Sequence, residues 1–331
     1  MQTFAHIMTK YLPLWVGLDI ILAITVGYLF PAVSVLEHLV PLLLFLMLYP
    51  MMVTLRIEEV GNALKHPKLL ATAMVLNFAV TPLLGWLWGH IFFSGTNSYL
   101  TAGFILKTLI PGSGMVAAWT GYARGKVGSA LVIVAVSLLL SLVMVPFWMW
   151  VLAGAYVTIE PLVIFRAMGL IVVAPLVAGV LTRRYAVRRW GQAKFQERAK
   201  VFPVISTCAM MPMLFIIVSF QAVMIVENLY WMLLVIVAIG TMYPLLYMAA
   251  IAFAKIGGVD YGDAVAMGYS VTAKAHAITI GVAATVFAGT PAVLPAAVAP
   301  VIQVPLMLAM LKTSGRVERY LSPRAVPEQA A

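Results

Sequence analysis

Five ionisable residues lie inside long apolar runs of the sequence: Asp19, Lys107, Arg166, Lys274 and His276. If these runs cross a membrane, each charge costs roughly 2.5–3.5 kcal/mol at mid-bilayer unless it is paired or hydrated, so each residue is a functional candidate. Lys107, Lys274 and His276 are potential cations, which favours a negative or strongly polar solute. Burial favours the neutral forms of Lys274 and His276, so either could release and accept a proton.

The remaining polar residues of these runs carry weaker signals. Asp19 is the one acid deep within a run. It either carries a proton or neutralises a lysine, and burial arguments favour neither. Arg166 stands near the end of its run, where a long side chain reaches back to the interface. Asn77, Ser137 and Gln303 either line a cavity or form hydrogen bonds between helices.

Motifs for other chemistry are absent from the sequence. Cys208 is the single cysteine, which excludes an intrachain disulfide and a multi-cysteine metal site, and we expect it to be a buried, inert apolar residue. Residues 257–263 carry two acids but lack the ligand series of a calcium loop. An intramembrane enzyme would need a nucleophile–base pair or paired acids, and only Asp19 is available. We therefore expect no enzyme, no resident metal and no cofactor; single-channel currents would distinguish a channel from a carrier.

The elements that must position these residues are membrane helices. The chain is 63% hydrophobic and 10% charged, whereas a soluble domain carries about 25% charged residues. Spanning segments in lipid must be helical, because open strand edges find no partners there. The sequence predicts an all-α membrane protein with a single domain over 1–312, a cytoplasmic tail over 313–331, and ten spans near 11–32, 37–55, 69–93, 99–121, 128–153, 161–182, 201–226, 229–254, 262–288 and 293–312.

The net charge of +10 arises from Lys and Arg residues placed in alternate gaps between these spans. This alternation predicts a multi-pass protein of the cell (inner) membrane with both termini in the cytoplasm. It also argues against nucleic acid as a partner and leaves membrane lipid and a small-molecule solute. A homo-oligomer is compatible with the same features. The basic stretch 183–200 could bind lipid or a regulator, but orientation explains it more simply.

An internal repeat relates the two halves of the chain. Residues 142–152 resemble residues 301–311 at an offset of 159, which superposes Val145–Pro146 on Val304–Pro305. Five spans precede each match, and an odd number of spans per repeat forces the second copy to run upside down. The repeats therefore cover about 11–153 and about 161–312, with inverted topology.

The same offset carries residues 110–115 onto residues 269–274. Pro111, Gly112 and Gly114 disfavour a continuous helix, and paired broken helices at equivalent places indicate the central site of a transporter. An ordinary proline kink with small residues for close packing is the alternative for the first stretch. The second stretch has neither Pro nor Gly, so its break rests on the repeat. We expect the two broken helices, in spans four and nine, to cross.

This placement assigns roles to the candidate residues. The backbone amides of Gly112 and Gly114, together with Ser113, would contact the solute. Charge complementarity would come from Lys107 and Lys274. Cavity lining would come from Thr272, Gln303 and Asn77, and proton coupling from His276, Lys274 or Asp19.

The segment from Tyr49 to Gly85, YPMMVTLRIEEVGNALKHPKLLATAMVLNFAVTPLLG, closely resembles the second-to-third span region of arsenite permeases. The resemblance continues through Met115–Trp119 and through residues 299–311, and covers most of the chain. These permeases belong to the bile acid/arsenite/riboflavin transporter superfamily. The resemblance implies ten spans in inverted repeats and a secondary transporter that expels arsenite or antimonite with the proton gradient, while sodium-coupled relatives import bile acids and other organic anions.

Several positions depart from the pattern of that family. Gly112 stands where the resemblance implies an arsenite-binding cysteine, Pro111 where it implies an arginine, and Ser137 where it implies an asparagine. The paired asparagines and glutamate of span nine are replaced by Ala273-Lys274-Ala275-His276, and a span-ten glutamate by Gln303; Asn77 and Val304–Pro305 are kept. Loss of the thiol removes the softest ligand for As(III). A lysine at a former sodium or proton site can substitute a fixed positive charge for the ion. We expect a small anion or a metalloid oxyanion of arsenite type, coupled to H+, with a sodium-coupled organic-anion importer as the alternative.

Overall fold

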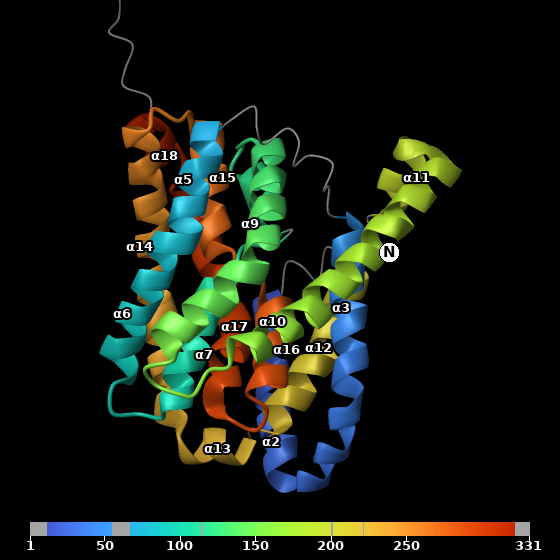
Figure 1. Cartoon of the computed structure of the whole chain (residues 1–331), viewed down its shortest axis with the longest axis vertical. Helices are drawn as coiled ribbons and strands as arrows, with labels where there is room; N and C mark the ends of the chain where they lie inside the picture. The colour runs from blue at the N-terminus through green and yellow to red at the C-terminus, as the bar shows by residue number, and fades with distance from the viewer. Residues whose placement is uncertain (1–11, 55–66, 114, 200, 221, 322–331) are drawn as a thin grey trace, which may run out of the picture.

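The computed structural model describes residues 12–54, 67–113, 115–199, 201–220 and 222–321, which form helices and the turns between them. Within these ranges no strand is present. Labels follow Figure 1. The first half contains α2 (Leu12–Leu29), the 3-10 helix η1 (Pro31–Leu39), α3 (Val40–Thr54), α5 (Pro67–Val75), the π-helical turn η3 (Leu76–Val80), α6 (Thr81–Phe93), α7 (Ser98–Leu109), α8 (Met115–Tyr122), α9 (Val127–Trp148) and the π-helical turn η4 (Met149–Ala153).

The second half has the same all-helical character. It contains α10 (Pro161–Met168), the π-helical turn η5 (Gly169–Val173), α11 (Ala174–Ala199), α12 (Phe202–Phe220), α13 (Ala222–Glu227), α14 (Leu229–Ile256), α15 (Tyr261–Thr272), α16 (His276–Val286), the 3-10 turn η6 (Pro291–Val293), α17 (Leu294–Lys312) and α18 (Ser314–Leu321).

The helices are long and apolar enough for a bilayer. Five stretches in the described part of the chain meet that requirement: Pro67–Phe93, Val127–Ala153, Pro161–Ala199, Leu229–Ile256 and Pro291–Lys312. Shorter apolar helices lie within α2, α3, α12 and α16. Large apolar side chains point outward along most of them, as expected where lipid rather than water is the solvent. The predicted class, an all-α membrane protein, is therefore confirmed.

The helices form two groups that lie side by side (Figure 1). In the smaller group, α3 packs against α11 and α12, and α12 packs against α2. In the larger group, α14 packs against α15 and α17, while α6 packs against α7. Small residues bring backbones close in membrane interfaces. At Gly103 of α7, for example, a Cβ atom would lie 2.0 Å from the carbonyl oxygen of Ala292, so only glycine fits.

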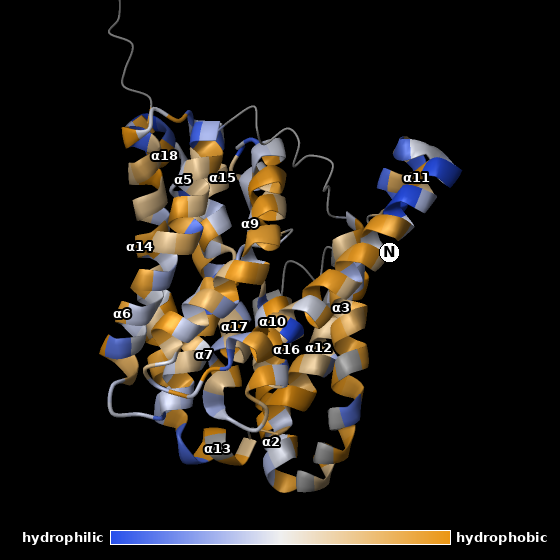
Figure 2. Ribbon diagram, viewed as in Figure 1, coloured by the Kyte–Doolittle hydropathy of each residue, from blue (hydrophilic) through white to orange (hydrophobic). Residues whose placement is uncertain are grey.

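The end of α11 leaves the bundle. Figure 2 shows hydrophilic residues gathered at this end, above the apolar body of the molecule. The helix changes direction at Gly191, whose φ of 77° and ψ of 159° are not helical. A left-handed φ of this kind favours glycine, which has no Cβ to clash with the backbone.

Candidate functional site at the helix crossing

Two interrupted helices meet in the larger group. The first stops at Leu109 and resumes at Met115, and the second stops at Thr272 and resumes at His276. Their open segments run antiparallel, with Gly112 paired to Lys274. The amide of Ser113 donates to the carbonyl of Ala273 at 3.2 Å, and the amide of Ala275 donates to the carbonyl of Pro111 at 3.0 Å. Each break thus satisfies backbone groups that the other exposes, which is what makes non-helical backbone tolerable at this depth.

The first break follows from its residues. Pro111 has no amide hydrogen, and a Cβ atom at position 112 would lie 2.5 Å from the side chain of Val116 and 3.0 Å from the carbonyl oxygen of Ser270. Glycine at position 112 therefore lets the two open backbone segments come into contact. Gly114, which was predicted to contribute an amide, lies outside the described residues.

The second break contains neither proline nor glycine, and a side chain from another helix holds it open. The Gln303 carboxamide of α17 accepts from the amide of Lys274 at 3.1 Å and donates to the carbonyl of Lys274 at 3.4 Å. These two bonds replace the helical partners that Lys274 lacks. Gln303 is buried, so its role in this conformation is to hold the break.

The ammonium group of Lys274 is buried at the crossing and donates to Oδ1 of Asn77 at 3.4 Å. Asn77 lies in the π-helical turn η3, a kind of irregularity that often marks functional positions. Its amide nitrogen donates to the Ser270 hydroxyl at 3.4 Å and to the Ala73 carbonyl at 3.2 Å. Asn77 therefore links α5 and η3 to the second broken helix, and Ser270 is a member of the site that the sequence did not single out.

Lys107 and His276 are buried beside Lys274 without hydrogen-bond partners in the described part of the chain. Neither Nζ of Lys107 nor either ring nitrogen of His276 has one. Lys107 is near enough to both Lys274 and His276 for their positive charges to repel. Within the described residues, no carboxylate forms an ion pair with any of the three. The crossing thus gathers three potential cations, and the described residues supply no counter-charge to them.

Other predicted residues are near the crossing but have their polar groups engaged. The Ser113 hydroxyl accepts from the amide of Met115 at 3.3 Å and so caps α8. The Thr272 hydroxyl donates to the carbonyl of Gly268 at 2.8 Å and lies 3.7 Å from the sulfur of Met307. In this conformation Thr272 has donated its hydroxyl hydrogen to Gly268, whereas the Ser113 hydroxyl only accepts and keeps a hydrogen that it could donate to a solute.

Two residues that the sequence singled out lie away from the crossing. Asp19 is half-buried in α2, and its Oδ2 has no hydrogen-bond partner among the described residues. It forms no ion pair with a described lysine, so both of its predicted roles stay predictions. Cys208 was expected to be buried, but it is exposed on α12. Its apolar helix presents that side to lipid, where a small thiol needs no polar partner.

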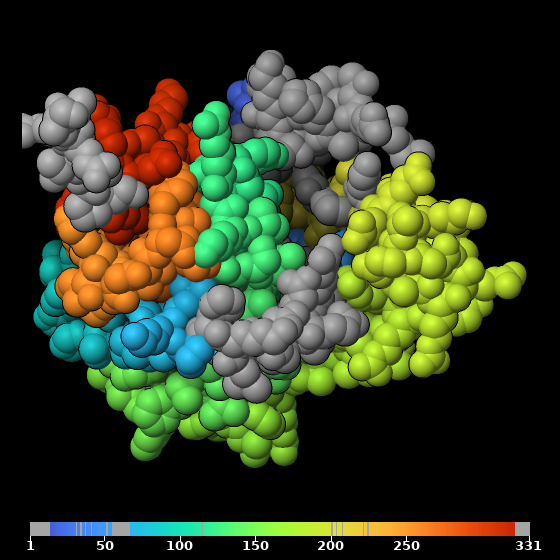
Figure 3. Space-filling model, turned by 90° about the horizontal axis from the view of Figure 1, so that it is seen from above, coloured from blue at the N-terminus to red at the C-terminus, as the bar shows by residue number. Residues whose placement is uncertain are grey.

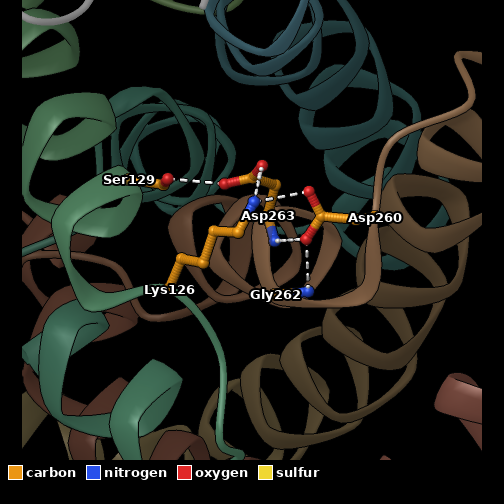
Figure 4. A network of polar contacts seen from close by, with 5 residues as sticks. All are labelled: Lys126, Ser129, Asp260, Gly262 and Asp263. Atoms are coloured by element: carbon orange, nitrogen blue, oxygen red, sulfur yellow. Dashed lines mark hydrogen bonds and ion pairs between the residues drawn. The ribbon is translucent and has the colours of Figure 1, made fainter.

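A second charged cluster, missed from the sequence, lies where α9 and α15 begin (Figure 4). Lys126 contacts Asp260 at 2.5 Å and Asp263 at 2.8 Å, and the Ser129 hydroxyl donates to Asp263 at 2.5 Å. Asp260 also caps α15 by accepting from the amides of Gly262 and Asp263. The cluster therefore ties the α8–α9 turn to the start of the second broken helix. The signal for it was an aspartate directly before an apolar run, which is an N-cap pattern.

The charges of this cluster reinforce one another. Hydrogen bonds to Asp260 and Asp263 raise the pKa of Lys126 above its usual value. Partial burial would raise the pKa of Asp260, but its bonds with Lys126 and Asp263 outweigh burial and lower it. A cation with raised pKa and an acid with lowered pKa stay charged throughout the neutral range. The cluster is therefore a fixed connection throughout that range.

A cavity of about 770 Å³ lies between the two helix groups, away from the crossing. Its lining is mostly apolar and includes Leu44, Ile217 and Ala284. Its two hydroxyls, of Ser219 and Thr285, donate to backbone carbonyls. Such a lining does not suit an anion. At the end where α9 begins, Figure 3 shows a second hollow, between α9 and α11.

These features define a class: a helical membrane protein with two broken helices that meet at a buried polar site, as in secondary transporters. The Sodium Bile acid symporter family matches residues 41–228, more than half of the 331 residues. The chain therefore belongs to the Sodium Bile acid symporter family, and the resemblance identified in its sequence is confirmed. It is a membrane transporter and not an enzyme.

Two individual relatives extend the match over more than nine tenths of the chain. The Arsenical-resistance protein Acr3 of Alkaliphilus metalliredigens is 29% identical over 94% of this chain and 93% of its own length. An uncharacterized transporter of Synechocystis sp. is 26% identical over 93% of this chain and 88% of its own. A probable sodium/metabolite cotransporter, BASS1, of Oryza sativa is 33% identical over 40% of this chain and 32% of its own.

Proposed function

We propose that the protein is an alternating-access secondary transporter that moves a small anion or a metalloid oxyanion of arsenite type, coupled to protons. The observation that carries the proposal is the buried pair Lys107 and His276, which have no partners in the described part of the chain and lie beside Lys274. The names of its arsenical-resistance relatives, from Alkaliphilus metalliredigens and Corynebacterium glutamicum, support the oxyanion as substrate.

The electrostatics of the crossing supply the reason for coupling. Burying several positive charges without a counter-charge is costly, and the cost is relieved either by losing protons or by binding an anion. An anion at the crossing would hold Lys107, Lys274 and His276 in their protonated forms. Anion binding and protonation then favour each other, so the solute binds more tightly as pH falls.

The α16 helix, which is the second half of the second broken helix, adds to this attraction for an anion. α16 begins at His276 with no side-chain cap, so its first amides and the positive end of its dipole face the crossing. In the proposal, His276 and these amides contact the solute first. Lys107 balances its charge, and Lys274, held by Asn77, exchanges the proton. Asp19, which is in the other helix group, is a further candidate proton carrier.

The proposed architecture is ten spans in two inverted repeats, about 11–153 and 161–312, with both termini in the cytoplasm and a tail over 313–331. The paired breaks at residues 110–114 and 273–275 support the repeat, and the alternation of Lys and Arg supports the orientation. In this scheme the two helix groups move against each other and expose the crossing to one side at a time. The hollow between α9 and α11 then opens toward the cytoplasm.

A sodium-coupled organic-anion symporter is the alternative. The name of the matching family and the sodium/metabolite cotransporter from rice favour it. The residues at the crossing argue against it, because sodium prefers oxygen ligands, and here Oδ1 of Asn77 accepts from the Lys274 ammonium while Oε1 of Gln303 accepts from the Lys274 backbone amide.

A substrate screen in proteoliposomes tests the proposal. Arsenite, antimonite and organic anions are each offered under an imposed pH gradient and, separately, under a sodium gradient. We expect uptake of at least one of these solutes to follow the pH gradient and to be flat in sodium. Uptake of an organic anion that requires sodium and ignores pH would establish the alternative.

A further inference from the structure

The end of α11 is an arm, residues 183–199, that is rich in exposed basic side chains. Arg184, Arg188, Arg189 and Lys194 are exposed, and within the described part of the chain none of the four forms an ion pair. The one acid of the arm is Glu197. Four exposed cations that form no ion pair with any described residue attract a partner that carries several negative charges.

The arm is a built structure. Its chain turns at Gly191, and Phe195 then packs with Ala186 and with Val53 of α3 in a small buried cluster. The Arg198 guanidinium lies 4.3 Å from the ring centre of Trp190, and that of Arg183 lies 5.4 Å from the ring centre of Phe195. A signal that only sets orientation in the membrane requires positive charge and no particular shape. The packing of the arm therefore indicates a second role for its cations.

The position of the arm identifies the partner. It begins where α11 passes the end of α3, with Gly179 against Met52 and Val53, so it emerges from the bundle at the membrane boundary (Figure 2). Tyr185 and Trp190 are exposed on it, and Tyr and Trp are the residues that favour the headgroup level of a bilayer. Basic side chains at that level attract anionic lipids.

We propose that the arm binds the headgroups of anionic phospholipids in the leaflet that it faces. Arg184, Arg188, Arg189 and Lys194 contact headgroup phosphates, while Tyr185 and Trp190 sit among the glycerol and upper acyl groups. This surface is separate from the crossing and uses none of its residues. It anchors α11, and with it the smaller helix group, to the bilayer while the larger group moves.

Native mass spectrometry of the full-length protein in detergent tests the proposal without measuring transport. Phosphatidylglycerol and phosphatidylcholine of matched chain length are offered at equal concentration. A basic residue near an anionic surface strengthens association roughly fivefold, so three of them account for about a hundredfold. With four basic residues in contact, we expect the wild type to retain phosphatidylglycerol roughly 600-fold better than phosphatidylcholine at low salt. We expect R184Q/R188Q/R189Q to reduce that preference about a hundredfold, to the roughly fivefold share of Lys194, and inorganic phosphate not to displace the lipid.

Two further variants make the result decisive. R184K/R188K/R189K keeps charge and orientation and should keep most of the preference, while R316Q/R319Q in α18 removes basic residues elsewhere and should leave it intact. A reporter fused to the C-terminus checks the orientation of each variant. Undiminished phosphatidylglycerol retention in R184Q/R188Q/R189Q would overturn the proposal, as would equal retention of both lipids by the wild type.

Discussion

The molecule contains two clusters of charge that are built in opposite ways. At the α9–α15 contact, Lys126 is paired with two aspartates, and every charge has a partner. At the helix crossing, Lys107 and His276 are buried without partners in the described residues, and Lys274 has only the amide oxygen of Asn77. Paired charges hold structural elements in place, whereas buried charges without partners can still form ion pairs or hydrogen bonds with a bound solute. The comparison indicates that the first cluster holds helices in position and that the second binds the solute.

The largest effect is expected at Lys274. Lys274→Ala removes the group that the proposal assigns to proton exchange together with its bond to Asn77, so transport should fall at least about a hundredfold. Proteoliposome uptake measures the effect, and the amount of protein in the membrane should match the wild type. Lys255→Ala, at the exposed end of α14, is the control lysine. Unchanged uptake in Lys274→Ala would remove this residue from the mechanism.

Lys107 provides the sharpest contrast with Lys126. Lys107→Met keeps the shape of the side chain but removes a buried amine that has no hydrogen-bond partner among the described residues, so the protein should become more stable to heat. The same variant should bind the transported anion about tenfold more weakly. Thermal unfolding in detergent and solute binding together measure the two changes. A loss of stability would show that Lys107 has a structural partner and belongs with the paired cluster.

Lys126 should behave in the opposite sense. Lys126→Ala leaves Asp263, whose side chain is only 9% exposed, without its cation, and should lower stability by about 1–2 kcal/mol. Lys126→Arg should restore most of that loss, and neither variant should change the affinity for the solute by more than about threefold. A weakening of binding as large as that in Lys107→Met would erase the distinction between the two clusters.

The pH dependence of the paired cluster has a definite sign. Because the pKa of Lys126 is raised in the folded protein, its contribution is complete below the ordinary lysine value and is lost only as pH rises through the raised one. Because the pKa of Asp260 is lowered, its contribution is complete above the ordinary aspartate value and is lost as pH falls through the lowered one. A response of transport between pH 6 and 8 should therefore persist in Lys126→Ala and disappear in Lys274→Ala.

The smallest effect of a substitution is expected at Cys208. It is exposed on α12 and lies far along the chain from both breaks, so Cys208→Ser should leave uptake and thermal stability within error of the wild type. Loss of metalloid transport in this variant would show that a thiol ligand is required.

The sequence predicts the first break better than the second. Pro111 and Gly112 disfavour a helix by their own residue type, which can be read from the sequence. The break at Ala273–Ala275 instead depends on Gln303, which is 29 residues away from Lys274 along the chain. Only the repeat offset pointed to it. Apolar runs and the placement of Lys and Arg likewise indicate helices and membrane residence, because these are local properties of the chain.

Contacts between segments that are distant along the chain could not be predicted from the sequence. Lys126 looked like one more residue that sets orientation, and its pairing with Asp260 spans 134 residues. Cys208 was expected to be buried, because an apolar helix gives little sign of which side faces lipid. Asp19 has no partner for its Oδ2 among the described residues, which the sequence did not indicate. Side-chain partners across a bundle depend on rotation and register, which a single sequence does not fix.

Equilibrium binding of the transported anion to the purified protein, in sodium-free buffer over pH 6–9, tests the central claim most directly. The account predicts that the wild type binds without sodium, that binding strengthens as pH falls, and that Lys274→Ala weakens both the binding and its pH response. Binding that requires sodium, or that survives unchanged in Lys274→Ala, would contradict it.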